Sequence, residues 1–283
     1  MKISILIACL FIPFYCQGLS ITWVKTAAPP FNMPTQSERL GVCDLLVDEI
    51  IARTPHLNHE IRVFPQARIN KYFERGDNLC YPCMIKKPSN NLFLYSTATT
   101  IYPPYEVITT TENQAKLQGK HGNPMSLPSL FADTSLSYGQ SVARRYSSTI
   151  QSLQKHIQGR QDVTLNYRAD DQAAALGDML TNQRVDYGID YPFIADFYNQ
   201  THGQELLATT AVQNQHNEII IGAVGCAAKA PDDFAQTVLD IINPIIRKDI
   251  LPSDKYQNHQ RQWLGKYFKN FNQSYSDQLL EQR

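Results

Sequence analysis

Beyond the first eighteen residues, the residues whose spacing suggests chemistry are four cysteines, Cys43, Cys80, Cys83 and Cys226. Cys80 and Cys83 flank a Tyr-Pro dipeptide, which is the spacing of a redox-active pair. Redox chemistry needs the first cysteine exposed at a helix N-terminus, where its thiolate is stabilised. Residues 79–85 read instead as a buried strand, so we interpret the four cysteines as structural disulfides. Four cysteines allow three pairings, and the spacing does not choose among them.

Other catalytic or metal-binding patterns are missing from the sequence. It has no G-x-S-x-G, H-E-x-x-H or phosphate-binding loop, and its seven histidines are scattered. One C-x-x-C without a second paired motif is half a zinc site. We therefore predict a protein that is not an enzyme and that carries no metal or cofactor. The alternative is a secreted thiol-disulfide oxidoreductase that uses Cys80 and Cys83.

The first eighteen residues have the composition of an export signal. Lys2 precedes an apolar run over residues 3–14, and residues 16–18 offer small side chains for cleavage. This run is too short to span a bilayer, and no later stretch reaches 18 apolar residues. We expect residues 1–18 to be a cleaved signal peptide, the mature chain to be periplasmic, and no direct membrane insertion. An even cysteine count fits that oxidising compartment.

Composition excludes two classes of protein. The 283 residues include 26 basic and 26 acidic side chains, so the formal net charge is zero. A protein that binds nucleic acid through a broad basic field needs an excess of lysine and arginine. Hydrophobic residues make up 43% of the chain, which is enough to build a core and excludes disorder. The length fits two lobes or one large α/β domain.

The first third of the chain alternates strand and helix patterns. We expect strands at 21–25, 61–64 and 79–85, and helices at 41–53 and 66–75. This order predicts a parallel sheet with right-handed crossovers. Short strands at 92–96 and 106–110 follow, separated by a rigid Tyr-Pro-Pro-Tyr segment. The polar stretch 109–118 is the best candidate for a crossing between lobes.

A second α/β unit follows. Helices are expected at 127–131, 141–158 and 171–181, and strands at 135–138, 163–167, 185–191, 209–213 and 218–224. Two C-terminal helices, 234–248 and 254–268, close the chain, with Trp263 and Phe268 as expected anchors.

Several short segments carry a family resemblance. They are Ile21-Thr-Trp with Pro29-Pro30-Phe31, Gly41-Val-Cys-Asp44, Pro65-Gln-Ala-Arg68 with Gly76-Asp77, Tyr95-Ser96, Ser135-Leu-Ser-Tyr-Gly139 and Arg184 to Pro192. Their order and spacing resemble the family 3 extracellular solute-binding proteins, which have the type II periplasmic binding-protein fold. Gln183 stands where the family usually has a glycine before its Arg-x-Asp strand.

The resemblance implies a two-lobe α/β fold, in which each lobe is a mostly parallel sheet flanked by helices and two hinge crossings join them. Lobe one would be residues 19–110 and 221–283, and lobe two residues 111–220. Cys80 and Cys226 would face each other on neighbouring strands, with Cys43 and Cys83 near the mouth of the cleft. This implies the bridges Cys80–Cys226 and Cys43–Cys83.

The resemblance also implies a function. Such a protein, expected to be a monomer, captures a small polar or anionic ligand between its lobes. It presents the ligand to an ABC permease or to a membrane sensor receptor. A second alternative is a scaffold of the same fold that binds no ligand and serves as an interaction module.

Ligand contacts are expected where an open α/β sheet presents the carboxyl ends of its strands. Phe31, Arg68 and Lys86 lie there in lobe one, against the alternatives of a core ring and two solvated charges. Phe31→Ala should then weaken binding with little loss of stability. In lobe two, the candidates are a helix-start anion cradle and a strand end, formed by Ser141, Arg144, Arg145, Asp190 and Tyr191. A helix cap with surface arginines and a core pair are the competing interpretations.

One departure from the family concerns the ligand. Amino-acid-binding members use an arginine just before the segment that ends here in Tyr95-Ser96, and it clamps the substrate carboxylate. Residues 87–92 contain no arginine. Because asparagine cannot replace a bidentate charged clamp, the sequence argues against an ordinary α-amino acid as the ligand.

Overall fold

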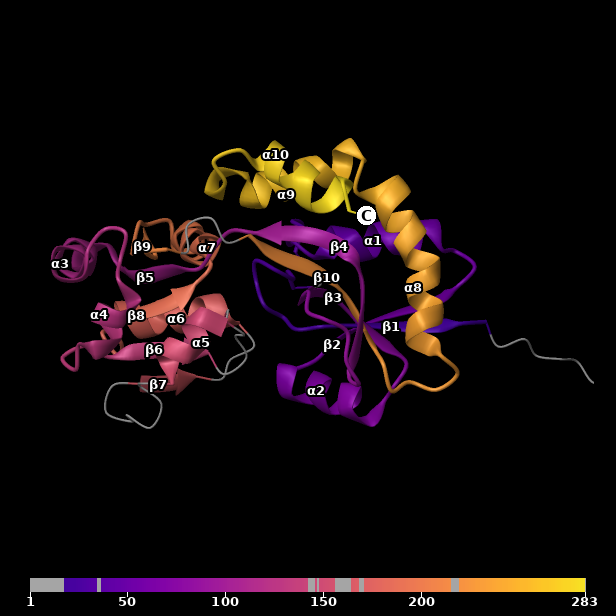
Figure 1. Cartoon of the computed structure of the whole chain (residues 1–283), viewed down its shortest axis with the longest axis horizontal. Coiled ribbons are helices and arrows are strands. Elements are labelled where there is room, and N and C mark those ends of the chain that lie inside the picture. Colours follow the sequence, from indigo (N-terminus) through magenta and orange to yellow (C-terminus); the bar gives the residue numbers. More distant parts are fainter. Residues whose placement is uncertain are drawn as a thin grey trace, which may run out of the picture.

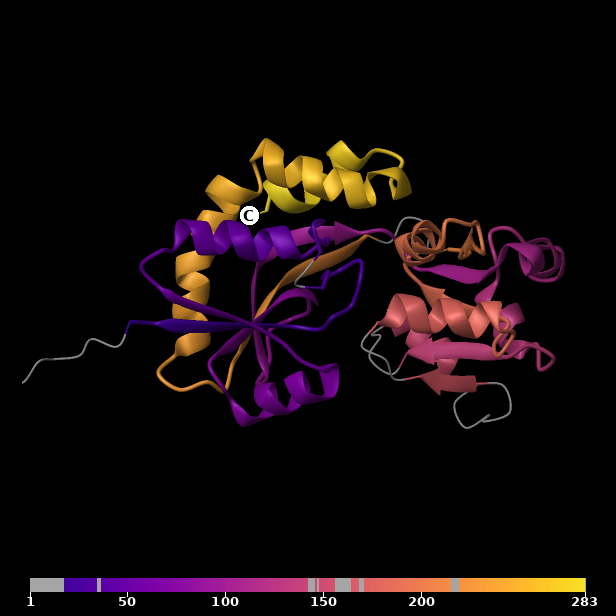
Figure 2. The same cartoon turned by 180° about the vertical axis from the view of Figure 1, so that it is seen from behind.

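The computed structural model describes residues 18–34, 37–141, 146, 148–155, 164–167, 171–214 and 219–282. The predicted signal segment therefore lies almost wholly outside the described residues. The described chain forms two five-stranded sheets, each flanked by helices, which lie side by side as two lobes (Figure 1, Figure 2). None of the helices within these residues combines the length and apolar character needed to cross a bilayer.

Lobe one is built on a sheet of strand order β2-β1-β3-β10-β4. Strand β1 runs parallel to β2 and β3, whereas β10 runs antiparallel to β3 and β4. The strands are β1 (Ser20–Lys25), β2 (Asn58–Val63), β3 (Leu79–Ile85), β4 (Phe93–Tyr102) and β10 (Ile220–Ala227). The helices of this lobe are α1 (Asp44–Arg53), α2 (Gln66–Arg75) and α8 (Phe234–Ile245).

Lobe two is built on a sheet of strand order β7-β6-β8-β5-β9. Strand β6 is parallel to β7 and β8, and β5 is antiparallel to β8 and β9. The strands are β5 (Glu106–Thr110), β6 (Tyr138–Ser141), β7 (Thr164–Tyr167), β8 (Tyr187–Asp190) and β9 (Leu207–Ala211). The helices are α3 (Thr111–His121), α4 (Leu127–Ala132), α5 (Ser148–Gln154), α6 (Gln172–Thr181) and α7 (Pro192–His202).

The first crossing between the lobes comes earlier than the sequence predicts. Strand β4 ends at Tyr102 in the first sheet, and β5 begins at Glu106 in the second, so the crossing is the Tyr-Pro-Pro-Tyr segment rather than residues 109–118. The polar stretch instead forms helix α3. Thr110 caps this helix by accepting a hydrogen bond from the Asn113 amide, and Leu117 is buried on its inner face. The second crossing lies between β9 and β10.

The C-terminal segment lies against both lobes. After α8 come a short π-helix η1 (Ile246–Ile250), α9 (Asp254–Leu264), η2 (Gly265–Tyr267), α10 (Phe271–Tyr275) and η3 (Ser276–Leu280). In Figure 1 this yellow segment lies above the two crossings and reaches toward α7 of lobe two. Trp263, one of the two anchors expected from the sequence, is buried, and Phe268 is half-buried.

Candidate functional site

The loop after β1 holds Phe31 in a fixed place. The Phe31 amide donates to the Ala28 carbonyl at 2.9 Å, and the Cys43 amide donates to the Phe31 carbonyl at the same distance. Gly41 permits this approach, because a Cβ there would lie 2.5 Å from the Phe31 carbonyl oxygen. The ring is therefore positioned by backbone contacts with the segment that leads into α1.

The Phe31 ring lies where the two lobes meet. It makes edge-to-face contacts with Tyr102 at the end of β4, and with Tyr191 and Phe193 of lobe two, at centroid distances of 5.8, 5.8 and 5.2 Å. Tyr105 and Tyr146 extend this group, with Tyr105 4.5 Å from Tyr191 and 5.2 Å from Tyr146. We call these six residues the hinge aromatic cluster. Phe31 is the only one of the six that is partly exposed.

Lys25, at the end of β1, is already paired. Its Nζ lies 2.7 Å from Asp44 Oδ1, and the other Asp44 oxygen accepts from the Met33 and Gly41 amides at 2.8 Å each. Asp44 is the first residue of α1, where the helix dipole favours a carboxylate. Asp44 therefore compensates the Lys25 charge within lobe one and ties the Phe31 loop to α1.

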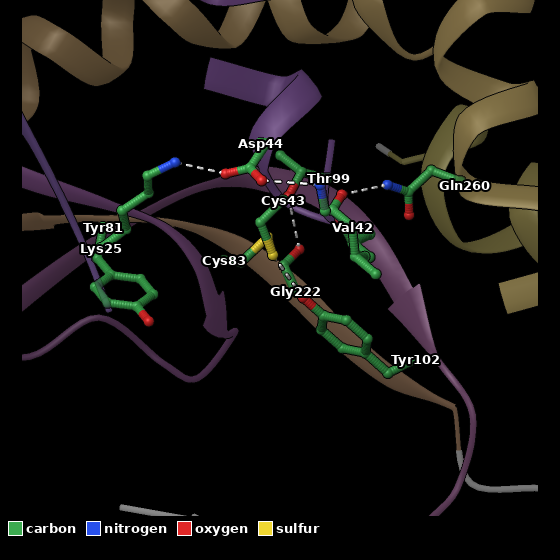
Figure 3. Close-up of a disulfide and its surroundings, with 12 residues drawn as sticks. Lys25, Val42, Cys43, Asp44, Tyr81, Cys83, Thr99, Tyr102, Gly222 and Gln260 are labelled. Carbon is green, nitrogen blue, oxygen red and sulfur yellow. Dashed lines mark hydrogen bonds and ion pairs between the residues drawn. A yellow bond between two sulfur atoms is a disulfide. The ribbon is translucent and has the colours of Figure 1, made fainter. Parts of the chain in front are cut away.

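The Cys43–Cys83 disulfide lies beside this ion pair. Figure 3 shows it between the Lys25–Asp44 pair and the Tyr102 ring, and Cys43 Sγ lies 3.7 Å from the Tyr102 hydroxyl. The bond ties the start of α1 to β3. The second disulfide joins Cys80 to Cys226 on the paired strands β3 and β10. These are the two bridges that the resemblance implies, and Cys80 and Cys83 are not bonded to each other as a redox pair requires.

Of the predicted cations in lobe one, Lys86 is the better placed. It follows β3 directly, and its amide donates to the Ile221 carbonyl at 2.7 Å. The side chain is exposed, yet partial desolvation by the surrounding protein lowers its pKa. No acidic partner for Lys86 occurs among the described residues. Arg68 is also exposed, but its guanidinium lies over the Phe64 ring at 5.4 Å.

The predicted residues of lobe two are only partly described. Asp190 and Tyr191 are both buried, and the Tyr191 amide donates to Asp190 Oδ1 at 2.7 Å. Burial raises the pKa of the nearby Tyr138 phenol, and the negative charge of Asp190 adds to the effect. Ser141 is the last residue of β6, whereas Arg144 and Arg145 lie outside the described residues.

No protein-family model and no curated protein matches this chain. A histidine-bound substrate-binding protein of an ABC uptake transporter from Streptococcus pneumoniae is 14% identical, with a TM-score of 0.62 over 88% of this chain and 93% of that one. A putative L-cystine ABC transporter protein from Listeria monocytogenes is 15% identical (TM-score 0.59; 90% and 99% covered). The periplasmic VFT2 domain of Bordetella pertussis BvgS is 13% identical (TM-score 0.60; 86% and 93%).

The chain has the type II periplasmic binding-protein fold. At these identities the likeness shows the fold alone. In this binding fold the carboxyl ends of the strands of both lobes face the space between them. Phe31 and Lys86 of lobe one and Asp190 of lobe two each follow or end such a strand.

The stretch before β4, residues 87–92, has a structural task. Asn90 Oδ1 accepts hydrogen bonds from the Leu92 and Phe93 amides, at 2.8 and 3.1 Å, and so forms the turn into β4. The Oδ1 atom of Asn90 is thereby occupied. Among the described residues, no three histidine, cysteine, aspartate or glutamate side chains gather where they could hold a metal ion.

Sequence reasoning missed most of the hinge aromatic cluster. It treated Tyr102 and Tyr105 only as the ends of a rigid segment, and it contained no helix at α7, which carries Phe193. A signal for this helix is present: Pro192 stands at its first position, apolar residues recur through it, and Gly203 follows with a left-handed φ of 66°.

Proposed function

We propose that this protein is an exported solute-binding protein that captures a small polar or anionic solute between its lobes. It releases the solute, chemically unchanged, to a membrane partner. The observation that carries the proposal is the position of Phe31, a partly exposed ring that contacts both lobes at the hinge. A ring in this place can contact a bound solute and the second lobe at the same time. Such contacts matter because a solute favours the closed form only through contacts that the open form lacks.

The charges of lobe one favour an anionic or polar solute. Asp44 compensates Lys25, whereas Lys86 has no acidic partner within the described part of the chain. An exposed ammonium is a point charge that can meet a carboxylate or phosphate through one or two hydrogen bonds. Residues 87–92 contain no arginine, so they offer no bidentate guanidinium clamp.

The membrane partner is either an ABC permease or a sensory receptor. The fold is shared with the binding protein of an uptake transporter and with a periplasmic domain of BvgS, and both kinds of relative support an extracytoplasmic location. Two disulfides fit an oxidising compartment such as the periplasm. A permease partner predicts that the solute accumulates in cells only when this protein is present, whereas a receptor predicts a signalling response without uptake.

A thermal-shift screen of residues 19–283 tests the binding function. The panel contains amino acids, L-cystine, glutathione, polyamines, organic acids and glycans. A compound at 100 times its Kd stabilises the native state by about 2.7 kcal/mol, which is easily measured. Saturable stabilisation by at least one compound supports the proposal, and the absence of any shift at millimolar concentrations contradicts it.

The role of Lys86 has a matched control next to it. Lys86→Ala should weaken binding of an anionic solute, whereas Lys87→Ala, at the neighbouring exposed lysine, should not. Equal effects of the two variants would contradict a specific role for Lys86.

Thiol titration tests the oxidoreductase alternative: a binding protein with two structural disulfides shows no reactive thiol until it is denatured and reduced.

A further inference from the structure

A second set of contacts joins the lobes through the C-terminal segment. Asp196 of α7 accepts a hydrogen bond from the Tyr267 hydroxyl, and its Oδ2 lies 2.5 Å from Lys266 Nζ. Next to these three residues, the centroid of the Phe197 ring lies 6.3 Å from that of the Trp263 ring. We call these five residues the hinge brace. Burial raises the pKa of Tyr267, and Asp196 raises it further, so the phenol remains a hydrogen-bond donor at neutral pH.

The C-terminal side of the brace belongs mechanically to lobe one. Three side chains of α9 hold three consecutive carbonyls of the segment that precedes α1. Trp263 Nε1 donates to Leu40 at 3.1 Å, His259 Nε2 lies 2.8 Å from the Gly41 oxygen, and Gln260 Nε2 donates to Val42 at 3.0 Å. Because α9 is fixed to lobe one, each contact between Asp196 and η2 is a contact between lobes.

The brace lies on the side of the crossings that is opposite α2 and α5. In Figure 1 the C-terminal helices lie above the crossing strands, whereas α2 of lobe one and α5 of lobe two lie below them. A rotation about the crossings that brings the lower parts of the lobes together moves the upper parts away from each other. The five brace residues, together with Gln200 of α7 and Gln262 of α9, line a small pocket at this same boundary.

We propose that the hinge brace sets solute affinity from a distance by stabilising the open arrangement of the lobes. This inference rests on the proposed function, since only a protein that closes on a solute has an affinity to set. Solute binding must break the brace, so the free energy of the brace is subtracted from that of binding. Removing the brace should therefore tighten binding, because the closed form becomes more populated before the solute arrives.

The first test measures the distance between the lobes without any solute. Nitroxide labels are placed on cysteines introduced by Lys71→Cys in α2 and Lys155→Cys directly after α5, both exposed positions. Electron–electron double resonance then compares Asp196→Ala and Tyr267→Phe with the parent. We expect both substitutions to shift the population toward shorter distances. An unchanged or lengthened distribution in both variants overturns the inference.

A control pair within lobe one matches the brace in exposure. The Asp77 side chain is 33% exposed and pairs with Arg75, as the 31% exposed Asp196 pairs with Lys266. Asp77→Ala should leave the distance distribution unchanged, and a shift as large as that of Asp196→Ala would overturn the inference. Circular dichroism of each variant confirms that the fold is retained.

The second test measures affinity by calorimetry with L-histidine, L-cystine and any compound that stabilises the parent in the thermal-shift panel. Surface ion pairs and hydrogen bonds of this kind predict a Kd about two- to tenfold lower for Asp196→Ala than for the parent. A weaker or unchanged affinity overturns the inference. If no compound binds any variant, the proposed function fails, while the distance measurement still decides whether the brace holds the lobes apart.

Discussion

Phe31→Ala separates the packing role of this ring from a role in binding. The half-buried side chain contributes about half of the roughly 1.5–3 kcal/mol of a fully buried phenylalanine. Its three edge-to-face contacts add about 0.5 kcal/mol each at the low end of the range for aromatic pairs. We expect a loss of about 2–3 kcal/mol in the free energy of unfolding. This exceeds the small loss that the sequence alone predicts.

Urea unfolding followed by far-UV circular dichroism measures this loss, with the dependence on urea concentration compared between variants. Phe31→Leu is the matched control, because it keeps most of the volume and loses only the ring contacts, at a cost of about 1.5 kcal/mol. A loss below about 0.5 kcal/mol for Phe31→Ala would refute the reasoning. The ring would then not be held by the hinge aromatic cluster.

Three further changes test single features of the structure. His59 Nδ1 accepts a hydrogen bond from Trp23 Nε1 at 3.1 Å, and burial lowers the pKa of His59. The stability that the neutral His59 ring provides is therefore fully present above the ordinary histidine pKa. It is lost as pH falls through the lowered pKa of the folded state. His59→Gln should reduce this acid dependence in urea titrations. Among the described residues, buried Asn32 has no hydrogen-bond partner for either atom of its side-chain amide. Asn32→Leu should therefore not lower the melting temperature, and a drop of several degrees would show that the amide is satisfied. Gly41→Ala would place a methyl group 2.5 Å from a backbone oxygen and should cost about 1–3 kcal/mol in urea unfolding; a cost near zero would contradict the close approach.

Local signals predicted several elements correctly. Helix α2 occupies the expected residues 66–75, because Pro65 precedes it and Gly76 ends it with a φ of 82°. Strand β3 matches the expected 79–85. In both segments, local backbone preference and hydrophobic pattern indicate the same structure, so no distant contact has to override them.

Other segments needed information that the pattern does not contain. The strand expected at 135–138 forms at Tyr138–Ser141 instead, since Asp133 accepts hydrogen bonds from the Ser135 amide and hydroxyl and turns the chain there. The helix pattern of residues 141–158 is described as helix only over Ser148–Gln154. A short polar residue before a strand can favour a turn over an extended conformation. The hydrophobic pattern alone does not show which of these two conformations the chain adopts.

The candidate site could be found from the sequence only through topology. Phe31, Lys86 and Asp190 were placed because strand ends share one edge of a sheet. The hinge aromatic cluster draws its other rings from a crossing segment, from α7 and from the single residue Tyr146, and no spacing along the chain connects them. Only the three-dimensional arrangement reveals that Phe31 belongs to this group.

One short segment couples the candidate site to the C-terminal helices. The carbonyls of Leu40, Gly41 and Val42 each receive a hydrogen bond from α9, while the amides of Val42 and Cys43 donate to the loop that carries Phe31. Consecutive backbone groups thus bind on both sides, as in the central strand of a sheet. The positions of the Phe31 ring and of α9 are therefore set by the same short segment, residues 40–43. A displacement of α9 away from α7 must be transmitted to Phe31 or absorbed by these bonds, which gives the hinge brace a physical route to the solute.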